Sequence, residues 1–444
     1  MRRSVDNCGG RRVGIGRTGM GLLCAGGVLF ACGCGRPSDE SAGEIITLHV
    51  ADWGGASSDP AMSRFEREVS AEWARTHPGI RIEMEHIPGS DEYVSKMLTA
   101  FVARTEPDVM SLDASSAAVF IENDTLVDLT PLVKADHLDL SVYYSNVLGL
   151  AQRGAHLYAL PADFTPMVLY YNRRLFDAAG VPYPQEGWTW EEFREDCKRL
   201  TLWPHGASHP TQYGFQLQNG MPGWIMWIWQ NGGDVLTPDG KRAAGALDSP
   251  ATAEAVAFFT DLVKVDHVAP SLSETQAQGA DPFQAGLTAM QISGHWNLVG
   301  LKASERIRIE DVGVVGLPRH KERCTVIYEA GYAITKDCKH PREAWEYVKF
   351  MSGPFVQQKK TELGIGISAM RSVAEARRHS SPPEPVFLDN VAYGRIPWGA
   401  RVENYAQVED LGKEMLDDIL IGNVPVERAL QATARRIDAR LDTQ

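Results

Sequence analysis

The segment Leu160-Pro-Ala-Asp-Phe-Thr-Pro-Met-Val-Leu-Tyr-Tyr-Asn-Arg-Arg-Leu-Phe176 carries the strongest prediction about the fold. Its first half is interrupted by Pro161 and Pro166, which predicts a polar loop carrying Asp163. The run Met167–Tyr171 is short, apolar and rich in β-branched and aromatic residues, which predicts a buried strand. In a two-lobed protein, such a strand can be the crossing between lobes, and its loop then faces the cleft.

The length and composition support two lobes. The chain has 444 residues, whereas one hydrophobic core usually serves roughly 250–300 residues. Its composition, 44% apolar and 23% charged, is typical of a folded soluble protein.

The first 34 residues are expected to be an export signal. Arginines precede an apolar stretch, Thr18–Ala31, that is too short to anchor the chain across a bilayer. The run Leu29-Phe30-Ala31-Cys32 resembles a bacterial lipobox, which predicts lipidation of Cys32, with Cys34 as the alternative. Gly33–Gly43 would then form a tether. The pair Arg11-Arg12 leaves twin-arginine export open beside the general secretory route.

Charge and cysteine content restrict the partners. Without this leader, whose net charge is +4, the chain carries −17 instead of −13, which argues against nucleic acid and anionic membrane surfaces as partners. Only Cys197, Cys324 and Cys338 lie outside the leader; they could hold one disulfide, with Cys324–Cys338 the expected pair.

No motif predicts a metal, a cofactor or catalysis. The sequence contains no H-E-x-x-H and no G-x-S-x-G, and its G-x-G-x-x-G, Gly14–Gly19, falls in the expected leader. We therefore expect neither a cofactor nor a metal.

The residues after the leader alternate between predicted strands and helices. Strands are expected at Glu44–Ala51, Ile80–Met84 and Asp108–Asp113, with helices from Ala61 and from Ser90 between them. This order is typical of a doubly wound α/β fold, whose ligands collect beyond the carboxyl ends of the strands. Trp53 and Asp113 lie at such ends.

Short motifs along the chain resemble one protein family in their order and spacing. They include Phe65-Glu66, His77–Ile82, Pro107–Val109, Leu126–Pro131, Tyr158–Pro161, Leu169–Asn172, Trp188–Phe193, Gln230–Asp234, Gly294–Trp296, Glu329–Ile334 and Lys339–Trp345. In this order they resemble the extracellular solute-binding proteins of bacterial ABC importers, and more narrowly the sugar-binding family 1, which includes maltose-binding proteins.

The resemblance implies an α/β, two-lobed periplasmic-binding-protein fold with the ligand cleft between the lobes. Residues 45–163 and 317–365 would form the N-terminal lobe, and residues 166–312 and 366–444 the C-terminal lobe. The chain would be a monomer in the periplasm or on the outer face of the cytoplasmic membrane, held there only by its lipid. It would bind a carbohydrate (a mono- or oligosaccharide or a polyol derivative) by closing its cleft, and deliver it to the permease subunits of an ABC importer. It would not be an enzyme.

Sugar binding requires aromatic faces for stacking and planar polar groups that fix hydroxyls. Trp296, which follows Gly294 at a predicted strand end, matches the stacking tryptophan of the maltose-binding members. The other candidate ligand-binding residues are Trp224, Asp163, Asp113, Trp53, Glu329, Arg395 and Trp398. The alternative for each tryptophan is core packing, and for Asp163 it is a capping role in its turn.

Two other functions fit the sequence. The same fold could bind a phosphorylated polyol, an anion or a peptide, which basic residues such as Arg395 or Arg153 in the cleft would favour. An exported carbohydrate-active enzyme would instead need two cleft carboxylates roughly 5–9.5 Å apart.

Overall fold

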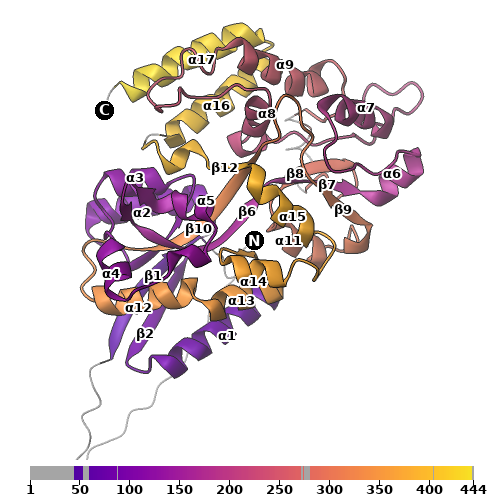
Figure 1. Ribbon diagram of the computed structural model, residues 1–444. Helices are drawn as coiled ribbons and strands as arrows, with labels where there is room; N and C mark the ends of the chain where they lie inside the picture. Colours follow the sequence, from indigo (N-terminus) through magenta and orange to yellow (C-terminus); the bar gives the residue numbers. More distant parts are fainter. Residues whose placement is uncertain are drawn as a thin grey trace, which may run out of the picture. The chain divides into compact units, whose positions relative to one another are not determined.

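The computed structural model describes residues 45–53, 60–87, 89–271, 274, 281–403 and 405–442. The expected export signal, with Cys32 and Cys34, lies outside these residues. The described chain forms two separate larger sheets flanked by helices (Figure 1), so the predicted α/β class is confirmed.

The first sheet has the strand order β11-β6-β10-β3-β1-β2, with β12 paired to β10. Its strands are β1 (Ile46–Asp52), β2 (Ile80–His86), β3 (Val109–Asp113), β6 (Ala159–Pro166), β10 (Thr325–Ile334), β11 (Ile367–Ser368) and β12 (Gly394–Arg395). β1 is parallel to β2 and β3, whereas β10 runs antiparallel to β3 and β6. The carboxyl ends of β1, β2 and β3 therefore meet at one edge of the sheet.

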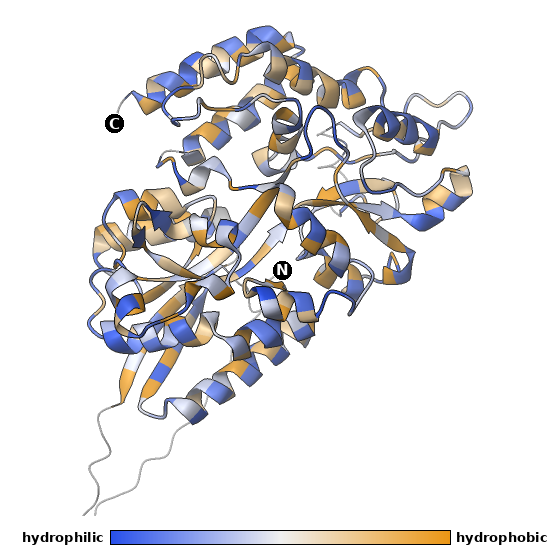
Figure 2. Ribbon diagram, in the orientation of Figure 1, coloured by the Kyte–Doolittle hydropathy of each residue, from blue (hydrophilic) through white to orange (hydrophobic). Residues whose placement is uncertain are grey.

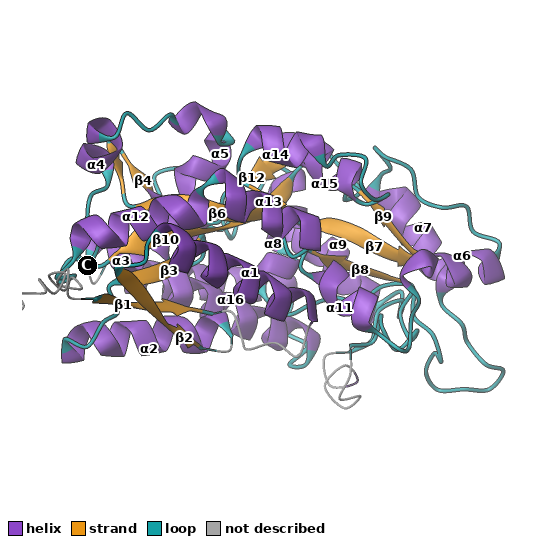
Figure 3. Cartoon of the chain, turned by 90° about the horizontal axis from the view of Figure 1, so that it is seen from below, coloured by secondary structure: helices purple, strands orange, loops and turns teal. Residues whose placement is uncertain are grey.

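The second sheet is smaller and antiparallel, with the order β8-β7-β9. Its strands are β7 (Val168–Asn172), β8 (Met290–Ser293) and β9 (Val312–Val315). β4 (Gln152–Arg153) and β5 (His156–Leu157) form a separate hairpin. Only Met167 separates β6 of the first sheet from β7 of the second, and Figure 3 shows β6 leading towards β7. The crossing expected in the opening segment is therefore present.

The helices lie between and around these strands. Those before β8 are α1 (Pro60–Thr76), α2 (Ser90–Ala103), α3 (Ala117–Glu122), α4 (Thr130–Ala135), α5 (Ser145–Leu148), α6 (Arg173–Ala179), α7 (Trp190–Leu200), α8 (Ile225–Gln230) and α9 (Pro250–Lys264). Those after it are α11 (Asn297–Ala303), α12 (Pro341–Ser352), α13 (Pro354–Leu363), α14 (Arg371–Ala376), α15 (Glu384–Asn390), α16 (Tyr405–Leu420) and α17 (Val426–Leu441).

Local sequence signals explain several of these boundaries. α7 begins with a capping box: the Thr189 hydroxyl accepts a hydrogen bond from the Glu192 amide (3.2 Å), and the Glu192 carboxylate accepts one from the Thr189 amide (2.7 Å). The amphipathic pattern of α17 is visible in Figure 2, where hydrophilic and hydrophobic residues alternate along the helix. Its apolar face, including Leu430 and Ile437, is buried in the same hydrophobic cluster as the apolar faces of α7, α8 and α9.

The prediction of a loop at Leu160–Pro166 is wrong, because these residues belong to strand β6. The register of β6 against β10 shifts between Ala330 and Gly331, so that Pro161 sits beside a β-bulge. A proline is tolerated at such a place because the ladder is already interrupted there. Asp163 therefore projects from a strand rather than from a flexible turn, and its position is fixed by the sheet.

The predicted disulfide is also wrong. Cys197, Cys324 and Cys338 are all free thiols. Cys324 is buried in the same core as α7 and α8, whereas Cys338 packs at the margin of the cluster that covers β1 and α12. Cys324 and Cys338 thus pack in different hydrophobic clusters. Their short spacing in the sequence does not indicate this.

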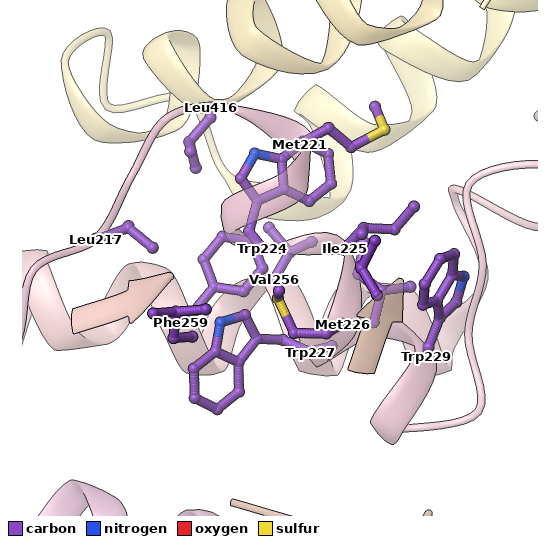
Figure 4. Packing of buried hydrophobic residues seen from close by; sticks show 14 of the residues in the cluster. Leu217, Met221, Trp224, Ile225, Met226, Trp227, Trp229, Val256, Phe259 and Leu416 are labelled. Atoms are coloured by element: carbon purple, nitrogen blue, oxygen red, sulfur yellow. The ribbon is translucent and has the colours of Figure 1, made fainter. Parts of the chain in front are cut away.

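The hydrophobic cluster around α8 includes Trp227 and Trp229 of the helix, and Trp224, which precedes it. Trp224, Trp227 and Trp229 are all at most 2% exposed, and Figure 4 shows them packed among Met221, Ile225, Phe259 and Leu416. Because aromatic side chains contribute large buried areas, this cluster joins α8 and α9 to the tail helix α16.

Candidate functional site

A cavity of about 620 Å³ lies between the carboxyl-end edge of the first sheet and the loop that follows β8. Its polar end is lined by side chains from the first sheet and its helices, and from the loop that follows β8 of the second sheet. These include Asp52, Trp53, Glu66, His86, Ser111, Asp163, Thr165, His295, Trp296 and Lys360. We call this polar end the cleft. Three of the predicted site residues, Trp53, Asp163 and Trp296, are brought together here.

Trp296 is the most exposed aromatic residue of the cleft. Its side chain is 50% exposed, although large apolar side chains are usually buried. It packs edge-on against Tyr328 of β10, with 6.1 Å between the ring centroids. Trp53, at the end of β1, is held in a similar edge-to-face contact by Tyr93 of α2, at 5.5 Å. Both indoles are fixed by neighbouring rings and still line the cavity.

Asp163 forms an ion pair with Lys360 of α13. The lysine side chain is only 9% exposed, whereas that of Asp163 is 29% exposed. The lysine therefore fixes the carboxylate, and part of the carboxylate stays open to the cavity.

A second carboxylate stands at the end of β1. Asp52 Oδ1 lies 2.7 Å from Nδ1 of His86, the last residue of β2, and Nε2 of His86 lies 3.9 Å from Glu66 of α1. The parallel register pairs Asp52 directly with His86. Asp52, His86 and Glu66 were not among the predicted site residues. The rule that selected Trp53 and Asp113, namely the carboxyl ends of parallel strands, applies equally to Asp52 and His86.

A hydrogen-bonded cluster joins the strand β6 to the loop that carries Trp296. The backbone amide of His295 donates to Thr165 Oγ1 (2.8 Å), and the hydroxyl of Tyr170 donates to the carbonyl of Gly294 (2.8 Å). The ring nitrogen Nε2 of His295 lies 3.1 Å from Glu384 at the start of α15. This cluster fixes the two residues that precede Trp296, Gly294 and His295.

The charge state of the Glu384 carboxyl follows from the same contacts. Burial by itself would raise the pKa of Glu384, but the hydrogen bond and the charge of His295, together with Ser381, lower it below its ordinary value. Glu384 is therefore ionised at neutral pH, and its carboxylate accepts a hydrogen bond from Nε2 of His295. No local sequence pattern predicts this pair, because α15 is distant in sequence from β8.

Five of the eight predicted residues do not line the cavity. Trp224 is fully buried in the core beside Phe259, and Trp398 is 3% exposed and donates to Asp234 (2.7 Å). Arg395 forms an exposed ion pair with Glu322 (2.7 Å). Core packing, the alternative considered for the tryptophans, describes Trp224 and Trp398 here. Arg153, which would have favoured an anionic ligand, pairs with Glu122 and does not line the cavity.

The fourth is Glu329. Its side chain is 3% exposed, it does not line the cavity, and neither carboxyl oxygen has a hydrogen-bond partner among the described residues. Burial raises the pKa of Glu329 well above its ordinary value, because a low-dielectric surrounding disfavours the charged carboxylate.

Asp113, at the end of β3, acts mainly within its own turn. Its carboxylate accepts hydrogen bonds from the amides of Ser115 (2.9 Å) and Ser116 (2.8 Å) and from the Ser116 hydroxyl (2.8 Å). This arrangement orders the turn before α3. Asp113 does not line the cavity, although the adjacent Ser111 does.

Two negative findings concern the described residues. They contain no group of three or more His, Cys, Asp or Glu side chains able to hold a metal ion. In the same ranges, no helix has both the length and the hydrophobicity needed to cross a bilayer.

Comparisons with known proteins agree with this architecture. Residues 55–358 match the family described as bacterial extracellular solute-binding proteins. The chain is 28% identical over 360 residues to an uncharacterized lipoprotein of Streptomyces antibioticus, covering 76% of this chain and 73% of that one.

Solved structures share the fold. A Listeria monocytogenes ABC substrate-binding protein in complex with cycloalternan superposes with a TM-score of 0.79 at 21% identity, covering 89% of this chain and 99% of that one. A Mycobacterium tuberculosis protein in complex with glycerophosphocholine gives 0.75 at 21% identity, covering 90% and 98%. At this identity the likeness concerns the fold alone.

Proposed function

Because this chain belongs to the bacterial extracellular solute-binding proteins, we propose that it binds a carbohydrate in its cleft and delivers it to the permease of an ABC importer. The solute would be a mono- or oligosaccharide or a polyol derivative. The cycloalternan complex of the Listeria protein is in keeping with this class of ligand.

The observation that carries the proposal is the pairing of open aromatic faces with carboxylates in one cavity. Trp53 and Trp296 line it together with Asp52 and Asp163. Indole faces stack on the C–H surface of a pyranose, and a carboxylate accepts hydrogen bonds from two hydroxyls. Trp296 stands on a loop next to the second sheet and Asp163 on a strand of the first, so one ligand would contact both lobes.

The charge of the cleft favours a neutral, hydroxyl-rich ligand over a phosphorylated one. Among the described residues, the lining lysine and arginine side chains are Lys360 and Arg81, and each forms an ion pair, with Asp163 and Glu83 respectively. Asp52, Glu66 and Asp163 would repel a phosphate unless it brought its own counter-charge. Glycerophosphocholine, the ligand of the Mycobacterium protein, does bring one, so a zwitterionic polyol phosphate is the second candidate ligand.

A binding role is proposed rather than catalysis. Asp163 is held by Lys360 and Asp52 by His86, contacts that orient a carboxylate as a hydrogen-bond acceptor. Absence of turnover on a glycan panel is the expected result; hydrolysis of any member would contradict the proposal.

We propose that the cleft closes about the segments that join the two sheets. Met167 is the entire link between β6 and β7, and residues 316–324 link β9 to β10. Residues 364–366 lead into β11, which is still a strand of the first sheet and precedes the helices α14 and α15. Residues 45–163 with 317–365, and 166–312 with 366–444, would then move as lobes. Ligand contacts made only in the closed form would shift the population towards it. The closed monomer would dock on the permease from the outer side of the cytoplasmic membrane, anchored through Cys32.

Isothermal titration against a panel of sugars tests the ligand class. We expect at least one sugar to bind, and Trp296→Ala to weaken it by about tenfold or more, as lost aromatic contacts commonly do. A zwitterionic phosphodiester such as glycerophosphocholine is titrated in parallel. If only the phosphodiester binds, the carbohydrate proposal fails and the second candidate replaces it.

A further inference from the structure

The cavity does not end at the cleft. It continues between the helix α1 and the strand β2, at the edge of the first sheet. Six apolar side chains line this continuation, namely Met62, Phe65, Val69, Ile80, Ile82 and Met84, and Ser70, Trp73 and Arg81 of the same two elements line the cavity as well. We call this part the side groove. All six side chains are apolar, in contrast to the carboxylates and imidazoles of the cleft.

The side groove exists because the apolar face of the sheet is not fully covered at its edge. Leu48 and Val50 of β1 are at most 1% exposed. Their register partners on β2, Ile82 and Met84, are only partly buried, as is Ile80. Register partners in a parallel pair point to the same face of the sheet. That face is therefore fully covered by other side chains at β1 but only partly covered at the neighbouring β2. Protein interiors are normally close-packed, and a continuous apolar cavity at this place is therefore a space for another molecule.

The strand β2 itself runs from the side groove into the cleft. Alternate residues point to the same face of a strand, and Ile80, Ile82, Met84 and His86 form such a series. The first three are apolar, whereas His86 is bonded to Asp52 in the cleft. At about 3.3 Å per residue, the apolar part extends for about 13 Å. One surface thus changes from apolar to polar along its length.

The segment that follows Trp53 in the sequence is small and polar. The six residues between Trp53 and Pro60 are Gly-Gly-Ala-Ser-Ser-Asp, which include no large apolar side chain. A charged occupant is disfavoured. Among the described residues, the two cationic side chains near this stretch are both paired: Arg81 is 65% exposed and pairs with Glu83. Lys360, whose Nζ lies 6.0 Å from the Phe65 ring centroid, pairs with Asp163.

We infer that the solute is a glycoside with a neutral apolar aglycone: its sugar lies in the cleft and its aliphatic or aromatic group in the side groove. This inference rests on the proposed carbohydrate function and narrows it. A ligand with both parts would fill the single cavity, whereas a simple sugar would leave the apolar half to water.

The test compares methyl with hexyl glycosides of glucose, galactose, mannose and maltose by isothermal titration. Each fully buried methylene is worth about a fourfold gain in affinity. Because the side groove is partly open, we expect the hexyl glycoside of the recognised sugar to bind at least about tenfold more tightly than its methyl glycoside. Equal affinities would overturn the inference and leave the proposed function intact.

Matched variants locate the gain. Ile82→Asn should reduce the hexyl-to-methyl affinity ratio to near one, while Glu83→Asn, whose side chain points to the other face of the same strand, should keep it. If Ile82→Asn does not fold, Met62→Gln on α1 provides the same comparison. A ratio that survives both groove substitutions would overturn the assignment.

A neutral apolar fluorophore, N-phenyl-1-naphthylamine, reports on the side groove independently of any sugar. We expect it to bind the wild type, to be displaced by the hexyl glycoside, and to bind Ile82→Asn weakly. If the fluorophore binds the wild type but not Ile82→Asn while no glycoside binds, the proposed carbohydrate function and the glycoside assignment both fail. If a sugar binds but the fluorophore does not, the side groove is not a binding site.

Discussion

The indole of Trp296 lies directly over Gly294, so closely that a Cβ atom built on the glycine would stand 2.4 Å from the ring. No real side chain tolerates that distance, so the absence of a side chain at Gly294 is what lets the ring lie where it lines the cleft. The Tyr170 hydroxyl bonded to the Gly294 carbonyl, and the His295 amide bonded to Thr165, hold the same backbone in place.

Gly294→Ala should therefore push the ring out of position. We expect affinity for the recognised sugar to fall by about tenfold, or about 1.4 kcal/mol, measured by isothermal titration. Gly300→Ala in α11 is the control, because a Cβ there would meet only Gln284 at 3.7 Å, an ordinary contact. Equal affinities for the two variants would show that the ring position does not matter for binding.

Trp224 and Trp296 separate a core role from a ligand-binding role. Trp224→Ala opens a void in a fully buried cluster and should lower the free energy of unfolding by about 3–5 kcal/mol. Trp296→Ala, at a half-exposed position, should change stability by about 1 kcal/mol or less and act on affinity instead. Thermal unfolding and titration of both variants distinguish the effects; a large loss of stability in Trp296→Ala would assign that residue to the core.

The contrast between these tryptophans shows how far sequence reasoning reaches. The first strands and helices and the crossing strand that begins at Met167 follow from local patterns, and those were predicted. Whether a tryptophan faces a cavity depends on the elements packed around it: Trp224 is enclosed by α9 and α16, which the short run Gly223–Trp229 does not encode. Asp163 was selected for the wrong reason, as a loop residue, since the bulge that admits Pro161 into β6 depends on its partner strand β10.

Residues contributed by distant elements were the hardest to predict. Lys360 reaches Asp163 from α13, and Glu384 reaches His295 from α15. Neither pair has a sequence spacing that could indicate contact. Glu329 was a candidate for ligand binding, but its place on the central strand β10 encloses its side chain, which is 3% exposed.

The sequence predicted a disulfide between Cys324 and Cys338, whereas both thiols are free in the structure. Burial raises the pKa of the Cys324 thiol to about 12, and that of Cys338 likewise to about 12, so both should react slowly with alkylating reagents in the folded protein at pH 8. After denaturation without a reductant, peptide mapping should find both alkylated, and dithiothreitol should leave the melting temperature unchanged. A Cys324–Cys338 peptide pair linked before reduction would contradict the structure.

Glu384 should influence binding although it lies behind His295. Glu384→Gln removes the charge that holds His295 Nε2, 3.1 Å away, and so loosens the loop of Trp296. We expect affinity for the recognised sugar to fall by about three- to tenfold, with a smaller change in melting temperature than Trp224→Ala produces. Glu375→Gln, which removes an exposed charge paired with Arg378, is the control and should leave affinity unchanged. An unaltered affinity in Glu384→Gln would show that this pair only supports the fold.

The buried carboxyl of Glu329 makes the strongest pH prediction. Its folded-state pKa is raised well above the value of 4.5 by burial, so the folded state binds a proton that the unfolded state releases. Stability should therefore fall as pH rises above about 4.5, by about 1.4 kcal/mol for each pH unit until the folded pKa is reached.

Glu329→Gln removes this dependence because glutamine is neutral at every pH. We expect the variant to melt at a higher temperature than the wild type at pH 7–8, and the difference to vanish near pH 4. Glu375→Gln again serves as a control, since the pKa of Glu375 is lowered by Arg378 and its removal should not stabilise the protein at pH 7. If wild type and Glu329→Gln lose stability in parallel between pH 5 and 8, Glu329 is hydrated or paired in solution, and the enclosed site described for it is wrong.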